Sequence, residues 1–195
     1  MLKRICLLGA SILFSISLSA QAFPSAEGPG LSVWAGASVS TYNPDYGCAK
    51  SSPFSCSNQL IGISPFVNTN GFLLGRIGAE GRAEFLHWHG PGGLTESSYL
   101  AGPRVYLYRY RKLTLSGDFL IGLARFNSPN SFSNGNYLAY APGAIFDYRI
   151  NRRLIARGAY EYQSWPSFKS LYAGSGHGGL TPNGFSIGVS YAIFH

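Results

Sequence analysis

Two histidines flank a tryptophan at His87-Trp88-His89 and are the clearest candidates for metal ligands in this chain. Residues i and i+2 of a strand share one face, so both imidazoles could contact the same ion. Protein metal sites typically use three or four ligands, and no third ligand stands nearby in the sequence. An interfacial tryptophan between two polar rings is the simpler interpretation, so we expect no metal site.

A second candidate for chemistry is His177, in a glycine-rich segment near the end of the chain. Nucleophilic catalysis needs a hydroxyl within reach of a basic imidazole and a carboxylate that orients the ring. Ser175 lies two residues before His177, and Glu161 is a distant candidate for the carboxylate. Gly178-Gly179 follow the histidine directly, and a glycine-rich loop without chemistry is the simpler interpretation. We expect no catalytic residue and no cofactor.

Cys48 and Cys56 stand in a stretch rich in Pro, Ser, Asn and Gly, residues 42–57. Two cysteines eight positions apart in an exported chain most often close a local loop. Metal binding is the alternative, but neither a histidine nor a third cysteine lies near them. We expect a disulfide.

The composition limits the kind of fold that could position these residues. The chain has 195 residues, which indicates one domain or at most two. Hydrophobic residues make up 46%, too many for a disordered chain, and charged residues only 12%, about half the usual globular share. With 25 glycines and 15% aromatic residues, this composition is typical of many strands rather than of a cytosolic enzyme.

The N-terminus predicts export. Lys3 and Arg4 precede an apolar run over residues 5–19, and Ala20-Gln21-Ala22 forms a small-x-small cleavage site. An uncleaved anchor is the alternative, but the run is short for a spanning helix, which needs about 20 residues. We therefore expect a cleaved signal peptide over 1–22, a short leader over 23–30 and one domain over 31–195. No later segment is long and apolar enough for a transmembrane helix, so a membrane location would require a closed barrel.

Eight apolar segments alternate with turn-rich gaps in the rest of the chain. The predicted strands are 31–41, 58–68, 73–88, 97–109, 113–126, 137–149, 154–166 and 184–194. Three gaps are tight, at Thr69-Asn70-Gly71, Tyr110-Arg111-Lys112 and 150–153, and four are long, at 42–57, 89–96, 127–136 and 167–183. Long and short gaps alternate strictly, as in outer-membrane barrels with short periplasmic turns and long outer loops. Asn70-Gly71 is also a hairpin signal.

Within these strands, charged and apolar residues alternate with period 2. A soluble sandwich would show the same parity with its charges outward, but the gap alternation, aromatic strand ends and signal peptide favour a barrel. Its narrow interior would be filled by mutually paired charges. The predicted lumen charge network is Arg76, Glu80, Arg82, Glu84, Arg104, Asp118, Asp147, Arg157 and Glu161. Glu80 and Glu84 lie roughly 13 Å apart along one strand, too far for a typical glycosidase pair.

The segment 97–109 fits this pattern less well. Arg104 shares its parity with Tyr106, Tyr108 and Tyr110, so these rings would point inward unless a bulge intervenes. Gly102 or Pro103 could mark such a bulge. Pro65 and Pro142 also fall inside predicted strands, where proline is tolerated only if the ladder is interrupted.

Residues 30–195 resemble the eight-stranded outer-membrane barrel family, the OmpA-like transmembrane domain. The strand number, the gap alternation and the end Phe185 to His195 carry the resemblance. That end is similar to the family's C-terminal assembly signal, although Phe194-His195 follow Ile193, which takes the usual terminal position. The resemblance implies an all-β, eight-stranded antiparallel up-and-down transmembrane β-barrel in the bacterial outer membrane. Outer-membrane lipids and, during insertion, the barrel-assembly machinery are the implied partners; no peptidoglycan-binding domain follows.

Two classes of function remain for such a barrel. The first is a non-enzymatic membrane protein with a plugged polar lumen, structural or contacting a surface ligand through four outer loops. The second is a lipid-modifying hydrolase, similar to a lipid A deacylase. A soluble exported β-barrel binder is a further alternative. The basic turns at 109–112 and 149–153 face anionic headgroups or solvent in this interpretation, and export makes nucleic acid an unsuitable partner.

The expected disulfide can be tested on the purified mature protein without reduction. Mass spectrometry should find Cys48 and Cys56 joined, because both fall in one exported loop. Two free thiols would contradict the prediction.

Overall fold

The computed structural model describes residues 31–44, 59–72, 76–88, 93–128, 134–168 and 179–194. The unit Leu31–His195 is considered by itself. The expected signal peptide and leader, both cysteines, His89, Ser175 and His177 lie outside the described residues. In the part of the chain that is described, no helix has the length and hydropathy to cross a membrane.

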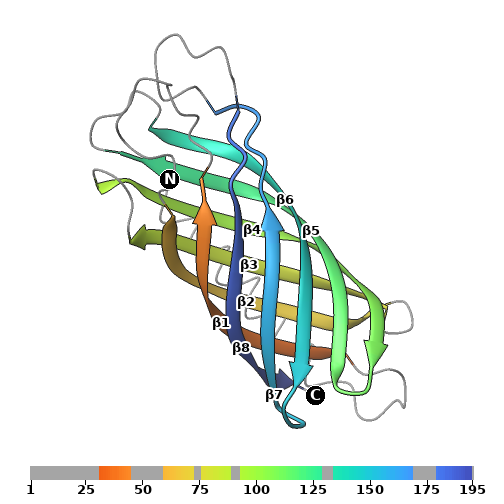
Figure 1. Ribbon diagram of the computed structural model, residues 1–195. Coiled ribbons are helices and arrows are strands. Elements are labelled where there is room, and N and C mark those ends of the chain that lie inside the picture. Colours follow the sequence, from red (N-terminus) through yellow and green to blue (C-terminus); the bar gives the residue numbers. More distant parts are fainter. Residues whose placement is uncertain are drawn as a thin grey trace, which may run out of the picture. The chain divides into compact units, whose positions relative to one another are not determined.

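Eight strands form one closed antiparallel barrel in which each strand pairs with its neighbours in sequence (Figure 1). The last strand pairs with the first, from Val33 opposite Phe194 to Asn43 opposite Asn183, and this pairing closes the ring. The predicted fold class is confirmed. The strands are β1 Ser32–Asn43, β2 Leu60–Phe72, β3 Ile77–Trp88, β4 Thr95–Tyr110, β5 Leu113–Asn127, β6 Gly135–Arg149, β7 Leu154–Tyr162 and β8 Asn183–Phe194.

The connections differ in length between the two ends of the barrel. Residues 73–76, 111–112 and 150–153 make the connections at one end, here named the short-turn end. Residues 44–59, 89–94, 128–134 and 163–182 make those at the other, the long-connection end. The predicted alternation is therefore confirmed.

The prediction of a hairpin turn at Thr69-Asn70-Gly71 is wrong. Asn70 is paired on both sides, opposite Ser32 of β1 and Gly78 of β3, and β2 continues to Phe72. Pairing with two neighbouring strands has overridden the local turn preference of Asn-Gly, and the connection to β3 falls between Phe72 and Ile77 instead. The turn after Tyr110 lies where it was expected, with Arg111 in the left-handed region at φ 52°.

A bulge in β4 separates its three tyrosines. Tyr106 pairs with Ser116 but Tyr108 pairs with Leu115, so Leu107 is the extra residue. The bulge reverses the parity, and Tyr108 and Tyr110 consequently lie on the outer face. The strand thus has the bulge that the parity of the tyrosines called for, but it lies at Leu107 and not at Gly102 or Pro103, the two positions considered from the sequence.

Each strand proline lies beside a gap in one ladder, because proline has no N–H to donate. The β2–β3 register passes from Ile63 to Phe66 across Pro65. The β4–β5 register likewise passes from Ala101 to Arg104 across Pro103. Pro142 stands between Tyr140, which bridges to Ser164, and Gly143, where the β6–β7 pairing begins. The sequence expectation for Pro65 and Pro142 is therefore confirmed.

The strand expected over 154–166 ends at Tyr162, but its ladder continues beyond that point. Ser164 bridges to Tyr140 of β6, and Trp165 bridges to Leu180 just before β8, both in the registers of the preceding strands. Residues 163–165 thereby stay in the barrel wall, and Trp165 is turned into the interior, where it is fully buried.

The barrel has an apolar outside, and a large part of its inside is polar. Inward positions carry serines and charged residues that are buried, such as Ser40, Ser64 and Glu80. Outward positions carry large apolar side chains that are largely exposed, such as Leu107, Ile187 and Ile193. This distribution is the reverse of that in a soluble globular protein.

Close approach of strands requires glycine at Gly122, where a Cβ atom would overlap the carbonyl oxygen of Tyr99. Gly122→Ala should therefore destabilise the barrel by about 1–3 kcal/mol through overpacking. Gly158→Ala is the matched control, because a Cβ there meets nothing within 4 Å. Urea unfolding in detergent micelles measures both variants, and equal stabilities would contradict the predicted strand approach.

Candidate functional site

The interior of the barrel gathers most of the expected charge network. Arg82, Arg104 and Arg157 are buried there together with five acidic side chains, those of Glu80, Glu84, Asp118, Asp147 and Glu161. Arg76 does not join them. It lies exposed before the start of β3, with its carbonyl oxygen accepting from the backbone N–H of Tyr106 at 2.9 Å. The strand expected from residue 73 begins only at Ile77, so Arg76 lies beyond the end of the lumen.

Glu80 is the one carboxylate that contacts all three buried arginines. Its Oε1 accepts from Arg82 Nη2 at 3.0 Å. Its Oε2 lies 3.4 Å from Arg104 Nη1 and 3.1 Å from Arg157 Nη1. A carboxylate has about four lone-pair sites, so one side chain can serve several guanidinium groups in this way.

Arg82 is surrounded by carboxylates from three strands. Nη1 lies 2.6 Å from Glu161 and 3.6 Å from Glu84, and Nη2 lies 3.0 Å from Asp118. These contacts cross the barrel interior and join β3 to β5 and β7. A buried guanidinium needs such partners, since an unpaired charge there would be strongly destabilising.

Neutral donors satisfy the carboxylates that outnumber the arginines. The Tyr42 hydroxyl lies 2.8 Å from Glu84 and 3.0 Å from Glu161. Gln163 Nε2 donates to the same two carboxylates at 2.7 Å each, and its Oε1 accepts from the Trp165 indole at 2.9 Å. The layer nearest the long-connection end is therefore a mixed ionic and neutral hydrogen-bond network.

A second ionic layer lies toward the short-turn end. Asp147 pairs with Arg104, and its Oδ1 accepts from Arg157 Nε at 2.9 Å. With its amide oxygen facing the arginines, Asn68 accepts from Arg104 Nη1 at 2.7 Å and Arg157 Nη2 at 3.2 Å. The Arg157 guanidinium also lies 4.0 Å from the centre of the Phe66 ring, a cation–π contact.

An apolar cluster covers the ionic layers at the long-connection end. Phe168 stands 5.1 Å from Phe126 and 4.9 Å from Tyr137, measured between ring centroids, and the Tyr137 ring stacks on that of Trp165. The cluster is Tyr42, Leu60, Leu86, Leu94, Leu100, Leu120, Ala124, Phe126, Ala139, Ala141, Trp165, Phe168 and Leu180, with Tyr137 packed against it.

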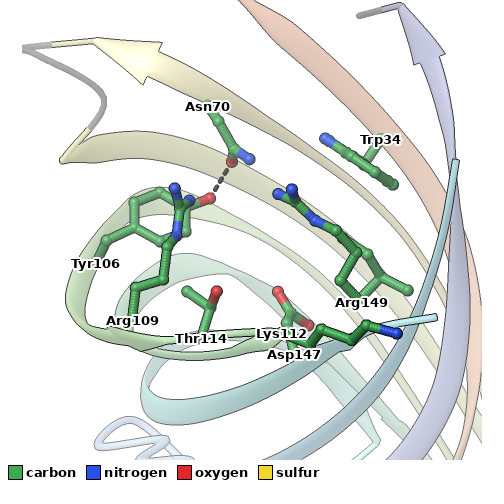
Figure 2. A pocket seen from close by; sticks show the side chains of 9 residues that line it. Trp34, Asn70, Tyr106, Arg109, Lys112, Thr114, Asp147 and Arg149 are labelled. Carbon is green, nitrogen blue, oxygen red and sulfur yellow. Dashed lines mark hydrogen bonds between the residues drawn. The ribbon is translucent and has the colours of Figure 1, made fainter. Parts of the chain in front are cut away.

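Side chains from several strands line a small cavity at the opposite mouth of the lumen (Figure 2). The cavity there holds about 20 Å³, room for roughly one water molecule. Tyr106 donates its hydroxyl hydrogen to the Asn70 side chain across this mouth. Arg109, Lys112 and Arg149 surround the opening, and Asp147 lines it from the ionic layer.

Glu161 and His87, two residues considered for chemistry from the sequence, lie on different faces of the barrel wall. Glu161 is held by Arg82, Tyr42 and Gln163 inside the lumen. His87 lies on the outer face, with its ring 6.3 Å from that of Phe85. Within the described ranges, no group of three or more His, Cys, Asp or Glu residues could hold a metal ion.

Several interior residues were missed from the sequence. Tyr42 stands before Asn43-Pro44, which resembles the start of a loop, yet it is the last inward residue of β1. Glu96 was assigned to a loop but is buried in β4, which starts at Thr95. The parity of Ser38 and Ser40 extends to Tyr42, so continuing the alternation by one step would have found it.

Comparison with solved structures places this architecture among known barrels. The crystal structure of Neisserial surface protein A (NspA) matches with a TM-score of 0.55 and 12% identity, covering 83% of this chain and 96% of that chain. Ail, the attachment invasion locus protein of Yersinia pestis, gives 0.48 at 16% identity over 84% and 97% of the two chains. OprG of Pseudomonas aeruginosa gives 0.49 at 11% identity over 86% and 98%. Neither a family model nor a curated protein sequence matches this chain. The chain has the eight-stranded barrel fold of NspA.

Removing the shared carboxylate tests whether the ionic network is dry. Glu80→Ala removes the carboxylate that all three buried arginines share and leaves their positive charges facing fewer negative ones. The free energy of unfolding should therefore fall by about 3–5 kcal/mol. Urea unfolding in detergent micelles, followed by tryptophan fluorescence, measures this loss. The control Arg125→Ala alters an exposed charge on β5 and should change stability by less than about 0.5 kcal/mol. Wild-type stability in Glu80→Ala would show a hydrated lumen instead.

Proposed function

We propose that this protein is a small non-enzymatic barrel of the bacterial outer membrane. Its lumen is plugged, and it acts structurally or through contacts made at the long-connection end. The observation that carries the proposal is the reversed distribution of side chains, with charges paired inside and large apolar groups exposed outside. An outer-membrane barrel requires both, whereas a soluble binder would expose this surface to water.

The outer face supports a lipid environment along the whole barrel. Val39, Val67, Ile121 and Leu138 come from four different strands, and each exposes more than 40% of its surface. Exposed aromatic rings lie toward both ends, as interfacial girdles do, with Tyr99 near the long-connection end and Tyr148 near the other. Outer-membrane lipids are therefore the proposed surroundings, and the barrel-assembly machinery is the proposed partner during insertion.

Two barriers in series support a closed lumen. The apolar cluster around Trp165 and Phe168 fills the interior at the long-connection end. Behind it, the arginine–carboxylate layers span the interior from β3 to β7, and the cavity at the short-turn mouth holds about one water. General porins need about 16–18 strands to leave an aqueous channel.

The connection lengths support one orientation in the membrane. Short turns face the periplasm and long loops the exterior in outer-membrane barrels. The start of β1 and the end of β8 then both lie on the periplasmic side. The long connections between strands then lie on the outer side of the membrane, where an external ligand would be met. The similar barrel NspA is described as a surface protein, which agrees with a contact role.

A non-enzymatic role is supported by how the acidic groups are used. Glu80, Glu84 and Glu161 all have partners within the packed interior, and none reaches a cleft that could admit a lipid substrate. The hydrolase considered from the sequence would need Glu161 as an orienting carboxylate, and that side chain is held by Arg82.

Planar-bilayer recording tests the closed lumen. The folded wild-type protein should give no stable large conductance, because both the apolar and the ionic layers block a continuous water path. Heat-modifiable gel migration of the same preparation is the control, since it shows that the barrel is folded. A stable large conductance from such a preparation would overturn the proposal and favour a channel.

A further inference from the structure

Exposed charge is distributed unequally over the barrel. Every acidic residue in the described part of the chain is buried inside the lumen. Exposed basic residues gather at the short-turn end, with Arg125 alone near the other end in the described segments. We call the set at the short-turn end the basic rim: Arg76, Arg109, Arg111, Lys112, Arg149, Arg152 and Arg153. This rim therefore has no exposed acid among the described residues to neutralise it.

One part of the basic rim borders an open cleft on the outside of the barrel. Asn151, Arg152, Arg153, Leu154 and Tyr191 line a space of about 510 Å³ beside the β6–β7 turn. Leu154 pairs with Tyr191 across the β7–β8 ladder, so the cleft sits where the turn meets the outer apolar face. It thus combines two cations with an aliphatic and an aromatic surface.

The turn that carries these cations has a defined conformation. The Asn151 side-chain oxygen accepts from the backbone N–H groups of Arg153 and Leu154, each at 2.8 Å. Arg153 Nη1 in turn donates to the Tyr191 hydroxyl at 3.4 Å. Asn151 thus fixes the backbone that presents both guanidinium groups, and Tyr191 orients one of them over the cleft.

We propose that this cleft binds an anionic phospholipid, with the phosphate between Arg152 and Arg153 and an acyl chain along Tyr191 and the outer face of β8. The proposal rests on the membrane location proposed above. Free phosphate would use the cations but not the apolar wall, whereas a phospholipid uses both. Val189 and Ile187 continue the exposed apolar surface of β8 away from the cleft, along the direction an acyl chain would take.

The charge balance selects an anionic over a zwitterionic headgroup. A zwitterionic lipid would bring a cationic amine into the basic rim, where the described residues offer no exposed carboxylate to receive it. An anionic headgroup adds only negative charge to a positive surface, and juxtamembrane Lys and Arg attract such lipids measurably. Phosphatidylglycerol is therefore the appropriate probe, with phosphatidylcholine as its zwitterionic counterpart.

The test compares lipid binding to the folded mature protein by native mass spectrometry from a nonionic detergent. Wild type should retain phosphatidylglycerol in preference to phosphatidylcholine. The double variant Arg152→Gln/Arg153→Gln should lower phosphatidylglycerol affinity by about tenfold. The matched control Arg109→Gln/Lys112→Gln removes the same charge from the lumen mouth, and its affinity should stay within about threefold of wild type.

Three results would overturn the proposal. Equal losses in the two double variants would indicate diffuse attraction to the basic rim rather than a site in the cleft. Displacement of the lipid by inorganic phosphate would indicate an anion site without a lipid component. Equal retention of both lipids by wild type would remove the selectivity for an anionic headgroup.

Failure of this inference can be distinguished from failure of the proposed function. Wild type and both variants are first folded into phosphatidylcholine vesicles and checked for heat-modifiable migration. A protein that inserts there without any preference for phosphatidylglycerol retains the proposed membrane role and loses only the lipid site. A wild-type protein that does not insert into either lipid contradicts the membrane location itself.

Discussion

Burial of three arginines inside a narrow barrel is the constraint on which the rest of the interior depends. Each guanidinium needs carboxylates around it, and these come from β3, β5, β6 and β7. Long side chains on these strands need space inside the barrel, and small inward residues on β8 leave room for them. The inward residues of β8 are small, such as Ser186 and Ser190, and a Cβ at Gly188 would overlap the backbone of β1. The small inward residues of β8 and the long charged ones of β3, β5, β6 and β7 thus pack together in the lumen.

The interior is organised in layers along the barrel axis. Aromatic and aliphatic residues pack together at the long-connection end, the Tyr42 and Gln163 hydrogen bonds follow, and the arginine–carboxylate layers lie beyond them. Gln163 joins the first two layers, because its amide contacts both carboxylates and the Trp165 indole. The Gln163 amide and the Trp165 indole next to the apolar cluster thereby have hydrogen-bond partners, as buried polar groups require.

The sequence predicted the repeating features and missed the local exceptions. Period-2 alternation placed Arg82, Arg104 and Arg157 inside, because strand parity repeats regularly over many residues. The turn predicted at Asn70-Gly71 was wrong, because pairing with strands on both sides outweighs the preference of one dipeptide for a turn. Arg76 was assigned to the lumen because strand boundaries depend on where pairing stops, which parity does not reveal.

The bulge at Leu107 could not be located for a similar reason. The anomalous parity of the tyrosines showed that an extra residue was needed, and glycine or proline is the usual sequence marker for irregular strands. The structure instead uses Leu107, whose side chain is exposed on the apolar outer face, where an extra aliphatic group is tolerated. Pro103 lies at a gap in the β4–β5 ladder, and the register is the same on both sides of the gap. The proline therefore marks an interruption of the pairing and not an extra residue.

The seam between β1 and β8 has a consequence for how the chain reaches this structure. Val33 meets Phe194, so the first and last strands can join only after the whole intervening chain is available. Contacts between such distant segments make folding slow, because a long loop must be closed before any pairing energy is gained. Any sheet that the other strands form before that point has two unpaired edges, each able to pair with another chain. The topology therefore requires that such edges be protected from other chains. This requirement ends when β8 pairs with β1.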